Sequence, residues 1–258
     1  MDGNGRYTYL NPRRGGKIAV AEAARNLVCS GARPLAITDG MNFGNPMKPE
    51  IFWQFEKAAE GISEACRQLE TPVTGGNVSF YNENPEQAIY PTPIIGMVGL
   101  LEEVDKAVGP GFQNQGDLIY LLGENKEELG ASQYLKIIHQ TKAGPVPELD
   151  LDQEKQIQDV CRQLIDQQLL ESAHDCADGG LAVALAESCI HGDIGAEVTL
   201  STELSPAALL FGETQSRIIV SFSPKNREKV EKLLEQKHIS YTPLGKVTGE
   251  SMCINEVI

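Results

Sequence analysis

The sequence predicts an α+β / α/β protein of two domains, each with helices packed on a sheet of short strands. Three observations support this prediction. The chain has 258 residues, 41% of them apolar, which is enough for two cores. Segments with helical periodicity alternate with short apolar segments bounded by turn residues. A segment rich in glycine and proline over 102–116 interrupts this alternation, so we expect domains over 1–108 and 109–258.

The first domain is predicted to hold two helices and three strands. Residues 1–6 read as a turn with no preceding element, which suggests a piece of a longer chain. The first helix ends at Gly31 and the second begins at Pro49; because both have one apolar face, we expect them to cover one face of the sheet. In chain order the pattern predicts a helix over 17–30, a strand over 34–39, a loop over 40–46, a helix over 49–69 and strands over 72–81 and 89–101.

The second domain is predicted to begin with a strand and to contain three further helices. Its longest helix follows a loop, and its second helix follows a turn with two glycines. In chain order the pattern predicts a strand over 117–123, a loop over 139–150, a helix over 151–170, a helix over 181–189, a polar turn and strand over 211–222, a helix over 223–236 and a last strand over 239–247.

The charge balance excludes several classes of partner. Lys and Arg number 22 against 36 Asp and Glu, and this net charge of −14 disfavours nucleic acids and anionic membranes. No apolar run reaches about 18 residues and no leader opens the chain, so we expect neither a membrane span nor a signal peptide. The six cysteines form no CxxC pair, which favours buried thiols and a cytoplasmic protein. An anion could meet a local basic cluster at Arg6, Arg13, Arg14 and Lys17, although such runs are more often solvated surface.

Polar residues at two predicted strand ends form the main candidate site. Asp39 is expected at the end of its strand, and the segment from Gly75 to Ser79 lies in the strand that follows the next helix. Paired glycines permit positive φ and a close approach of backbone N–H groups to phosphate, while the Asn77 oxygen and the Ser79 hydroxyl suit Mg²⁺ or a substrate hydroxyl. The alternatives are a β-bulge or tight hairpin for the glycines, and an Asx-turn or helix cap for Asp39.

A second polar constellation lies in the second domain. Asp175 and Asp178 precede Gly179 and a helix, where carboxylates most often cap the helix and complement its dipole. The functional alternative is a metal site in which Asp175 reaches Mg²⁺ on a nucleotide. Glu213 and Gln215 likewise form either a solvated turn or a polar ligand edge.

Familiar catalytic motifs do not occur. The sequence has no Gly-x-Ser-x-Gly nucleophile motif, Walker loop, Gly-x-Gly-x-x-Gly fingerprint or zincin helix. The residues by themselves therefore predict a two-domain protein with a Mg-nucleotide site at Asp39, Gly75, Gly76 and Asn77, without a substrate or a reaction.

Four motifs together resemble a known family. They are Lys-Ile-Ala-Val-Ala-Glu-Ala-Ala-Arg-Asn-Leu-Val, Ala-Ile-Thr-Asp-Gly-Met-Asn-Phe-Gly-Asn-Pro, Thr-Gly-Gly-Asn-Val-Ser-Phe-Tyr-Asn-Glu and His-Asp-Cys-Ala-Asp-Gly-Gly-Leu. In this order they resemble the C-terminal half of the phosphoribosylformylglycinamidine synthase family, whose synthetase subunit is similar to a duplicated aminoimidazole ribonucleotide synthetase. The resemblance implies a ferredoxin-like N-terminal domain followed by an associated C-terminal α/β domain.

The resemblance implies an ATP-dependent ligase of purine biosynthesis. ATP activates the amide oxygen of formylglycinamide ribonucleotide, and ammonia from a glutaminase subunit displaces phosphate, with Mg²⁺ stabilising the phosphoryl charge. At the matching positions Asp39 and Gly76 contact ATP, Asn77 contributes to Mg²⁺ and Ser79 contacts the substrate. The family's catalytic His and most Mg²⁺ ligands belong to its N-terminal half, which is absent from this sequence.

The absent half leads to further expectations. The family's active site lies between the two halves, so this chain should form one wall and be inactive alone. The pseudo-symmetry of the halves makes Asp175, Glu213 and Gln215 weak candidates for a second, non-catalytic nucleotide site. We expect the N-terminal half, the glutaminase subunit and a small accessory subunit as partners, and a homodimer of the fragment through the sheet that the family uses against the missing half. The alternative function is a non-catalytic nucleotide-binding or assembly module.

Overall fold

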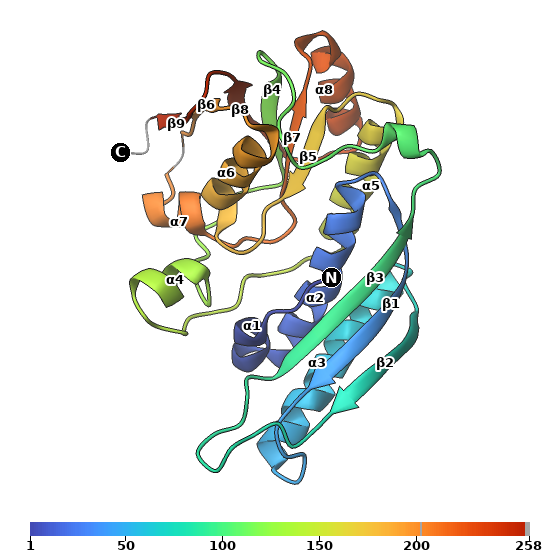
Figure 1. Ribbon diagram of the computed structural model, residues 1–258, viewed down its shortest axis with the longest axis vertical. Coiled ribbons are helices and arrows are strands. Elements are labelled where there is room, and N and C mark those ends of the chain that lie inside the picture. The colour runs from blue at the N-terminus through green and yellow to red at the C-terminus, as the bar shows by residue number, and fades with distance from the viewer. Residues whose placement is uncertain (202, 256–258) are drawn as a thin grey trace.

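The computed structural model describes residues 1–201 and 203–255, which form two sheets with their helices (Figure 1). We call the elements up to residue 101 the three-stranded unit and those after residue 114 the six-stranded unit. This mixed α/β architecture confirms the predicted fold class. The predicted division at residues 108 and 109 stays a prediction.

The three-stranded unit has one more helix than the sequence pattern predicted. Its elements are α1 (Gly5–Leu10), α2 (Pro12–Val28), β1 (Arg33–Asn42), α3 (Pro49–Gln68), β2 (Val73–Ser79) and β3 (Thr92–Leu100). The turn expected over 1–6 is wrong, because the Asn4 side chain accepts hydrogen bonds from two backbone N–H groups and starts α1. The helix expected from residue 17 begins at Pro12 for the same reason, since the Asn11 side chain caps it.

The sheet of this unit has the order β2-β1-β3, with β2 parallel and β3 antiparallel to β1. Both pairings continue through Gly40, Met41 and Asn42, where the sequence pattern predicted a loop. The predicted strand end at Asp39 is therefore wrong, and Asp39 lies inside β1. Glycine and asparagine suggested a loop there, yet hydrogen bonds from strands on both sides keep this segment extended.

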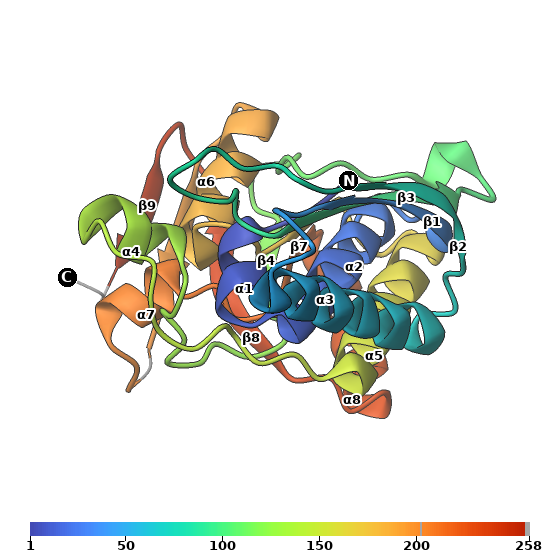
Figure 2. The same cartoon turned by 90° about the horizontal axis from the view of Figure 1, so that it is seen from below.

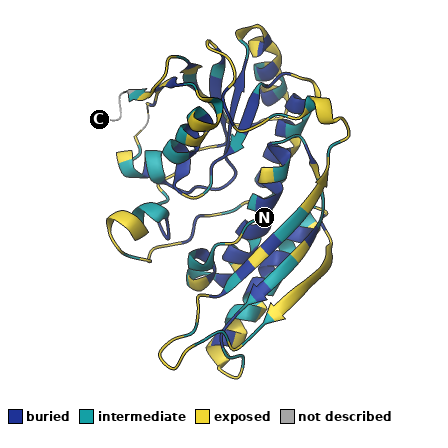
Figure 3. Ribbon diagram, viewed as in Figure 1, coloured by how far each residue is buried: buried dark blue, intermediate teal, exposed yellow. Residues whose placement is uncertain are grey.

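The two faces of this sheet differ. Ile37, Met41 and Ile95 are buried against α2 and α3, as the helical patterns predicted, and Figure 2 shows these helices together on one side of the sheet. The opposite face, which we call the bare face, carries Ile94 and Val98, which are 38% and 63% exposed. Figure 3 shows the exposed colour along β2 and β3. The bare face thus presents apolar groups to solvent, a feature typical of contact surfaces.

The six-stranded unit is covered on both faces. After η1 (Val104–Lys106), which lies between the two units, its elements are β4 (Leu118–Leu122), α4 (Gln133–Ile138), α5 (Leu151–Asp166), β5 (Ser172–Asp175), α6 (Gly180–Gly192), β6 (Ala196–Thr199), α7 (Pro206–Phe211), β7 (Ile218–Phe222), η2 (Pro224–Asn226), α8 (Arg227–Gln236), β8 (Tyr241–Val247) and β9 (Met252–Asn255). The strand order is β5-β7-β4-β8-β6-β9. Alternate residues of β4 and β7 enter one core with α5 and α8 and another with α6.

Several predictions for this unit are confirmed and one is wrong. The pattern placed α5, α6, β4, β7 and α8 correctly to within a few residues, but it missed β5, β6, α4 and α7, which are short. The strand predicted as the last of the chain is β8; β9 follows it and pairs in parallel with β6. These missed elements have four to six residues, too few for a clear periodicity.

The two units share buried surface. Val28 and Cys29, at the end of α2, belong to the same core as α5 and α8, and Figure 1 shows α2 lying beside α5. The connection over 139–150 returns across the first unit, where Arg14 donates to the Val146 carbonyl at 2.6 Å and pairs with Glu148 at 2.7 Å. Helix α2 is therefore a structural element of both units.

Two further expectations concern environment. Among residues 1–201 and 203–255, no helix is both long and apolar enough to cross a bilayer. Cys29, Cys66, Cys161 and Cys176 are buried, which confirms the expectation of buried thiols for four of the six cysteines. The expectation is wrong for Cys189, which is half-buried, and for Cys253, which is exposed.

Candidate functional site

The first candidate site lies where β1 and β2 run side by side, and we call Asp39, Gly75, Gly76, Asn77 and Ser79 the polar edge. Asp39 is the parallel partner of Gly76, and the next pairs are Gly40 with Asn77 and Asn42 with Ser79. The structure therefore brings together the residues that the sequence placed in two separate segments. Their predicted roles are not tested by this proximity alone.

Gly76 is required by the Asp39 side chain. A Cβ atom on Gly76 would lie 2.0 Å from Asp39 Oδ1 and 2.6 Å from the Asp39 carbonyl oxygen, whereas a Cβ on Gly75 would meet nothing within 4 Å. The reason for glycine is thus Asp39, whose carboxylate and backbone carbonyl both lie within 2.6 Å of the position that a Cβ would take. The sequence analysis expected a positive φ, and this is wrong, because both glycines have extended backbone inside β2.

The alternative interpretations can now be judged. The pairing register shifts between Ile37 and Thr38, where Thr74 is the extra residue of β2, so the β-bulge alternative is correct one residue before the glycines. The Thr74 hydroxyl donates to the Ile37 carbonyl at 3.0 Å and stabilises this bulge. A helix cap by Asp39 is wrong, because the N-cap residue of α3 is Lys48.

The polar edge is divided between the two faces of the sheet. Ile37 and Met41 are buried towards the helices, so Asp39, two residues from each, lies on the helix side with Gly76. Asn77 and Ser79 pair with Gly40 and Asn42 and lie on the bare face. A ligand that contacts both sets must wrap around the exposed edge strand β2.

Charge at the polar edge is negative. Desolvation raises the pKa of the Asp39 carboxyl above its ordinary value, and burial with a contribution from Asp39 raises the pKa of Cys66 on α3. Glu83 lies beyond the end of β2, where it accepts from the Asn45 N–H at 3.0 Å and pairs with Lys48 at 3.1 Å, so it holds a loop. These contacts with Asn45 and Lys48 lower the pKa of Glu83.

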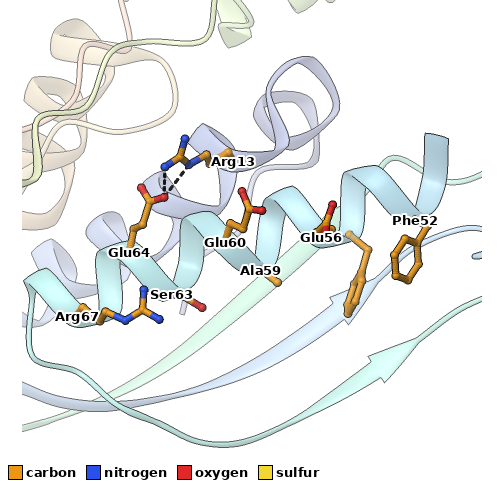
Figure 4. A pocket seen from close by; sticks show the side chains of 9 residues that line it. Arg13, Phe52, Glu56, Ala59, Glu60, Ser63, Glu64 and Arg67 are labelled. Carbon is orange, nitrogen blue, oxygen red and sulfur yellow. Dashed lines mark hydrogen bonds and ion pairs between the residues drawn. The ribbon is translucent and has the colours of Figure 1, made fainter. Parts of the chain in front are cut away.

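The predicted basic cluster is used within the chain. Arg6 pairs with Asp178 at 3.1 Å, and Arg13 and Lys17 both pair with Glu64 on α3. Figure 4 shows the Arg13–Glu64 pair beside a cavity of about 580 Å³ on the outer side of α3, lined also by Phe52, Glu60 and Arg67. This cavity includes no residue of β1 or β2 and is separate from the polar edge.

The residues present fit a shared metal site better than a complete one. Among residues 1–201 and 203–255, no group of three or more His, Cys, Asp or Glu side chains is placed to hold an ion. Asn77 offers one amide oxygen on the bare face. Mg²⁺ commonly takes few protein ligands together with water and substrate phosphates, so Asn77 suits one position of such a site.

The second constellation, Asp175, Glu213 and Gln215, is buried. Glu213 and Gln215 are hydrogen-bonded within the chain, whereas Asp175 Oδ2 has no hydrogen-bond partner among the described residues. Glu213 accepts from Tyr7 Oη and from the backbone N–H groups of Gln133 and Gly179, at 2.7 and 2.9 Å for the latter two. The predicted capping of α6 by Asp175 and Asp178 is wrong, because Asp175 ends β5 and Glu213 binds the N–H of the N-cap residue Gly179. A solvated turn at Glu213 is wrong as well.

Sequence reasoning missed the residue at the centre of this region. Arg25 of α2 is 0% exposed, donates to Glu154 at 2.7 Å and donates to Gln215 at 2.9 Å. One signal was available, since Arg25 lies between Ala21 and Ile18 on the helical wheel, inside an Ala-rich segment. An arginine in that position needs buried partners.

Comparison with known proteins identifies both parts of the chain. Residues 1–101 match the family model described as AIR synthase related protein, N-terminal domain, and residues 114–254 match the corresponding C-terminal domain. The chain is 56% identical over 254 residues to the phosphoribosylformylglycinamidine synthase subunit PurL of Moorella thermoacetica, covering 98% of this chain and 35% of that protein. It is 50% identical to PurL of Alkaliphilus metalliredigens, covering 97% and 34%. The chain therefore spans about a third of these curated relatives.

Solved structures share the fold. The structure of PurLQS from Thermotoga maritima superposes with a TM-score of 0.77 at 19% identity and covers 99% of this chain and 42% of that chain. T. maritima PurL complexed with FGAR gives a TM-score of 0.79 at 20% identity, with coverage of 98% and 42%. At this level of identity the likeness establishes the fold.

Proposed function

Because the chain belongs to the AIR synthase related family, we propose that it forms one half of an ATP-dependent carbon–nitrogen ligase of purine biosynthesis. The reaction converts formylglycinamide ribonucleotide, ATP and glutamine-derived ammonia to formylglycinamidine ribonucleotide, ADP and phosphate. The identity of 56% to a synthase subunit supports this assignment. The observation that carries it is the pairing of Asp39 with Gly76 next to Asn77 and Ser79 on an exposed strand.

The polar edge supports a distinct role for each residue. Asp39 and Gly76 contact ATP, since the bare glycine backbone and the carboxylate over it form one surface beside α3. Asn77 gives one oxygen to Mg²⁺, which when bound offsets the charge of the phosphate oxygens. Ser79 contacts the ribonucleotide; its hydroxyl lies 3.3 Å from the Asn82 side chain, which fixes its position.

The bare face supports a partner surface. In this proposal the N-terminal half of the family lies against it and completes the site, because no group of three or more His, Cys, Asp or Glu side chains is placed to hold an ion among the described residues. A glutaminase subunit and a small accessory subunit complete the assembly in the cytoplasm, and in isolation the fragment forms a homodimer through the same face. Weak second-site roles for Asp175, Glu213 and Gln215 gain no support from their internal bonds.

A second candidate function is a non-catalytic nucleotide-binding or assembly module, inactive without the N-terminal half. The hydrogen bonds and ion pairs between the two units favour the assembly module, because they hold the chain in one arrangement to which other subunits could bind. The two candidates differ in whether the polar edge takes part in turnover.

Complementation distinguishes them. The chain is mixed with a separately produced N-terminal half, and ADP release is measured with glutamine or ammonia present. We expect turnover that Asp39→Ala and Asn77→Ala each reduce at least about 100-fold, which corresponds to about 2.7 kcal/mol of transition-state stabilisation. Asp105→Ala, an exposed carboxylate of η1, is the matched control and should leave turnover unchanged. Nucleotide binding that survives both substitutions, without turnover in any mixture, would support the assembly module instead.

A further inference from the structure

Arg25 is the most completely enclosed cation of the described residues that pair across the two units. It lies on α2 and its guanidinium donates through Nη1 to Glu154 Oε2 at 2.7 Å and through Nη2 to Gln215 Oε1 at 2.9 Å. Its Nε lies 3.8 Å from Asp175 Oδ2, and Nη2 lies 3.9 Å from Glu22 Oε2. The planar fork of arginine thus faces acceptors on several sides, which a lysine could not match.

The acceptors come from separate parts of the six-stranded unit. Glu154 belongs to α5, Asp175 ends β5, and Gln215 precedes β7. All three are buried, with Glu154 at 0% exposure. One guanidinium from the first unit therefore hydrogen-bonds to two elements of the second and lies within ion-pair distance of a third, Asp175, whose Oδ2 makes no hydrogen bond with it. We call these residues with Glu22 the Arg25 cluster.

A second layer of bonds fixes Glu154. The Ser216 hydroxyl donates to Glu154 Oε2 at 2.5 Å and Gln158 donates to Oε1 at 2.6 Å. The same Gln158 amide also lies within hydrogen-bond distance of the Ala21 carbonyl, at 3.2 Å, one turn before Arg25 on α2. The hydrogen bonds from Arg25 through Glu154 and Gln158 therefore lead back to α2 at Ala21.

The charges around Arg25 explain why a cation is needed at this position. Glu154, Asp175 and Glu22 bring three carboxylates to one arginine, and buried carboxylates without a counter-charge are strongly disfavoured. Desolvation raises the pKa of Glu22 and of Asp175, which is the direction expected for carboxyls that are buried close together. The guanidinium is already the cation beside these carboxylates, 2.7 Å from Glu154 Oε2 and 3.8 Å from Asp175 Oδ2.

We propose that Arg25 is a permanent internal cation that locks the two units together, so that the second constellation holds the domain arrangement and binds no metal or nucleotide. The inference does not rest on the ligase proposal, because it concerns other residues and needs no turnover. It assigns Asp175 and Gln215 to the interface between the units. It also explains why α2 is buried on two sides.

Hydrogen–deuterium exchange on the chain as it exists tests the lock. In Arg25→Met we expect the backbone amides of α2 and of the first turns of α5 to exchange at least tenfold faster, while those of β4 change less. General destabilisation would accelerate all of these segments together. Arg25→Lys keeps the charge without the fork, should give an intermediate effect, and carries the test if Arg25→Met does not fold. Arg162→Met, which removes a surface pair with Asp166 at 3.4 Å on α5, is the matched control and should change nothing.

A metal titration tests the second part. The chain is titrated with Mn²⁺, and binding is followed by electron paramagnetic resonance. Asp175→Asn should bind the same amount of Mn²⁺ as the unaltered chain. A bound Mn²⁺ lost in Asp175→Asn would overturn the proposal. So would interface amides that exchange at the unaltered rate in both Arg25→Met and Arg25→Lys.

Discussion

The polar edge and the Arg25 cluster contain similar residue types in opposite environments. At the polar edge, Asn77 and Gly76 are exposed, and Asp39 has a carboxylate over bare backbone. In the Arg25 cluster, Glu154 is 0% exposed and bonded to three side chains. One set of polar groups is left for solvent or a ligand, and the other is consumed by the fold.

This difference teaches how to separate binding groups from structural ones. A buried polar group is usually bonded within the chain because its desolvation is costly, so internal bonding such as that of Glu154 marks a structural role. Arg25 Nε and Asp175 Oδ2 are the described atoms of the cluster that have no hydrogen-bond partner. An exposed polar group beside a glycine that a neighbouring side chain requires has no such explanation. The motif containing Asp39 is therefore the better candidate for ligand binding, although both motifs read alike in sequence.

Among the substitutions that test the difference between the polar edge and the Arg25 cluster, Gly76→Ala is expected to have the largest effect. The new Cβ would lie 2.0 Å from Asp39 Oδ1, so Asp39 or β2 has to move, at a cost of about 1–3 kcal/mol. In the complementation mixture we expect at least about a 100-fold loss of ADP release. Gly75→Ala is the matched control, since its Cβ meets nothing within 4 Å. Its free energy of unfolding and its ADP release should both stay close to those of the unaltered chain. Equal effects of the two substitutions would remove the reason given for Gly76.

Much of the fold could be predicted from the sequence because its long elements have strong periodicity. The apolar face of α3 and the proline at its start fix that helix within one residue of the prediction. Short elements such as α7 and β6 could not be predicted, since tertiary contacts decide them. The loop expected after Asp39 failed for the same reason, because β2 and β3 hold Gly40 to Asn42 extended.

The candidate site could be predicted in part. Two separate segments suggested one site, and the register of β1 with β2 places Asp39 beside Gly76. The division of Asp39 and Asn77 between two faces could not be predicted, because the end of β1 was placed too early. Arg25 and Glu154 were missed, since a contact between residues 129 positions apart leaves no local pattern.

The pH dependence of the free energy of unfolding tests the buried carboxyls next to the Arg25 cluster. Asp2 borders the Arg25 cluster; desolvation raises its pKa from 3.8 to about 6, with Arg25 acting in the opposite direction. The folded chain therefore holds this proton more tightly than the unfolded chain, and stability falls as the pH rises from about 4 to about 6. Asp2→Asn removes this slope, so we expect it to be more stable than the unaltered chain above pH 6, by about 1–2 kcal/mol. Urea unfolding at a series of pH values measures the difference.

A carboxylate with the opposite shift is the control for that measurement. Hydrogen bonds from Lys17 and Arg13 outweigh desolvation and lower the pKa of Glu64. Its contribution to stability is present above the unfolded pKa and is lost as the pH falls through the folded pKa. Glu64→Gln should therefore lower stability near neutral pH, where Asp2→Asn raises it. The same sign for both substitutions would contradict the assignment of Asp2 to a desolvated cluster.

The smallest expected effect concerns the surface next to the polar edge. Val98 lies on the bare face and is 63% exposed, so a homodimer through this face would bury it. Val98→Lys places a charge in that contact, and we expect sedimentation velocity to show a dimer dissociation constant about threefold higher. Val104→Lys is the matched control, because Val104 is 73% exposed in η1, away from the sheet. A clean monomer at high concentration would show that the bare face does not join two copies of this chain. The exposure of the polar edge would then have to be explained by a ligand alone.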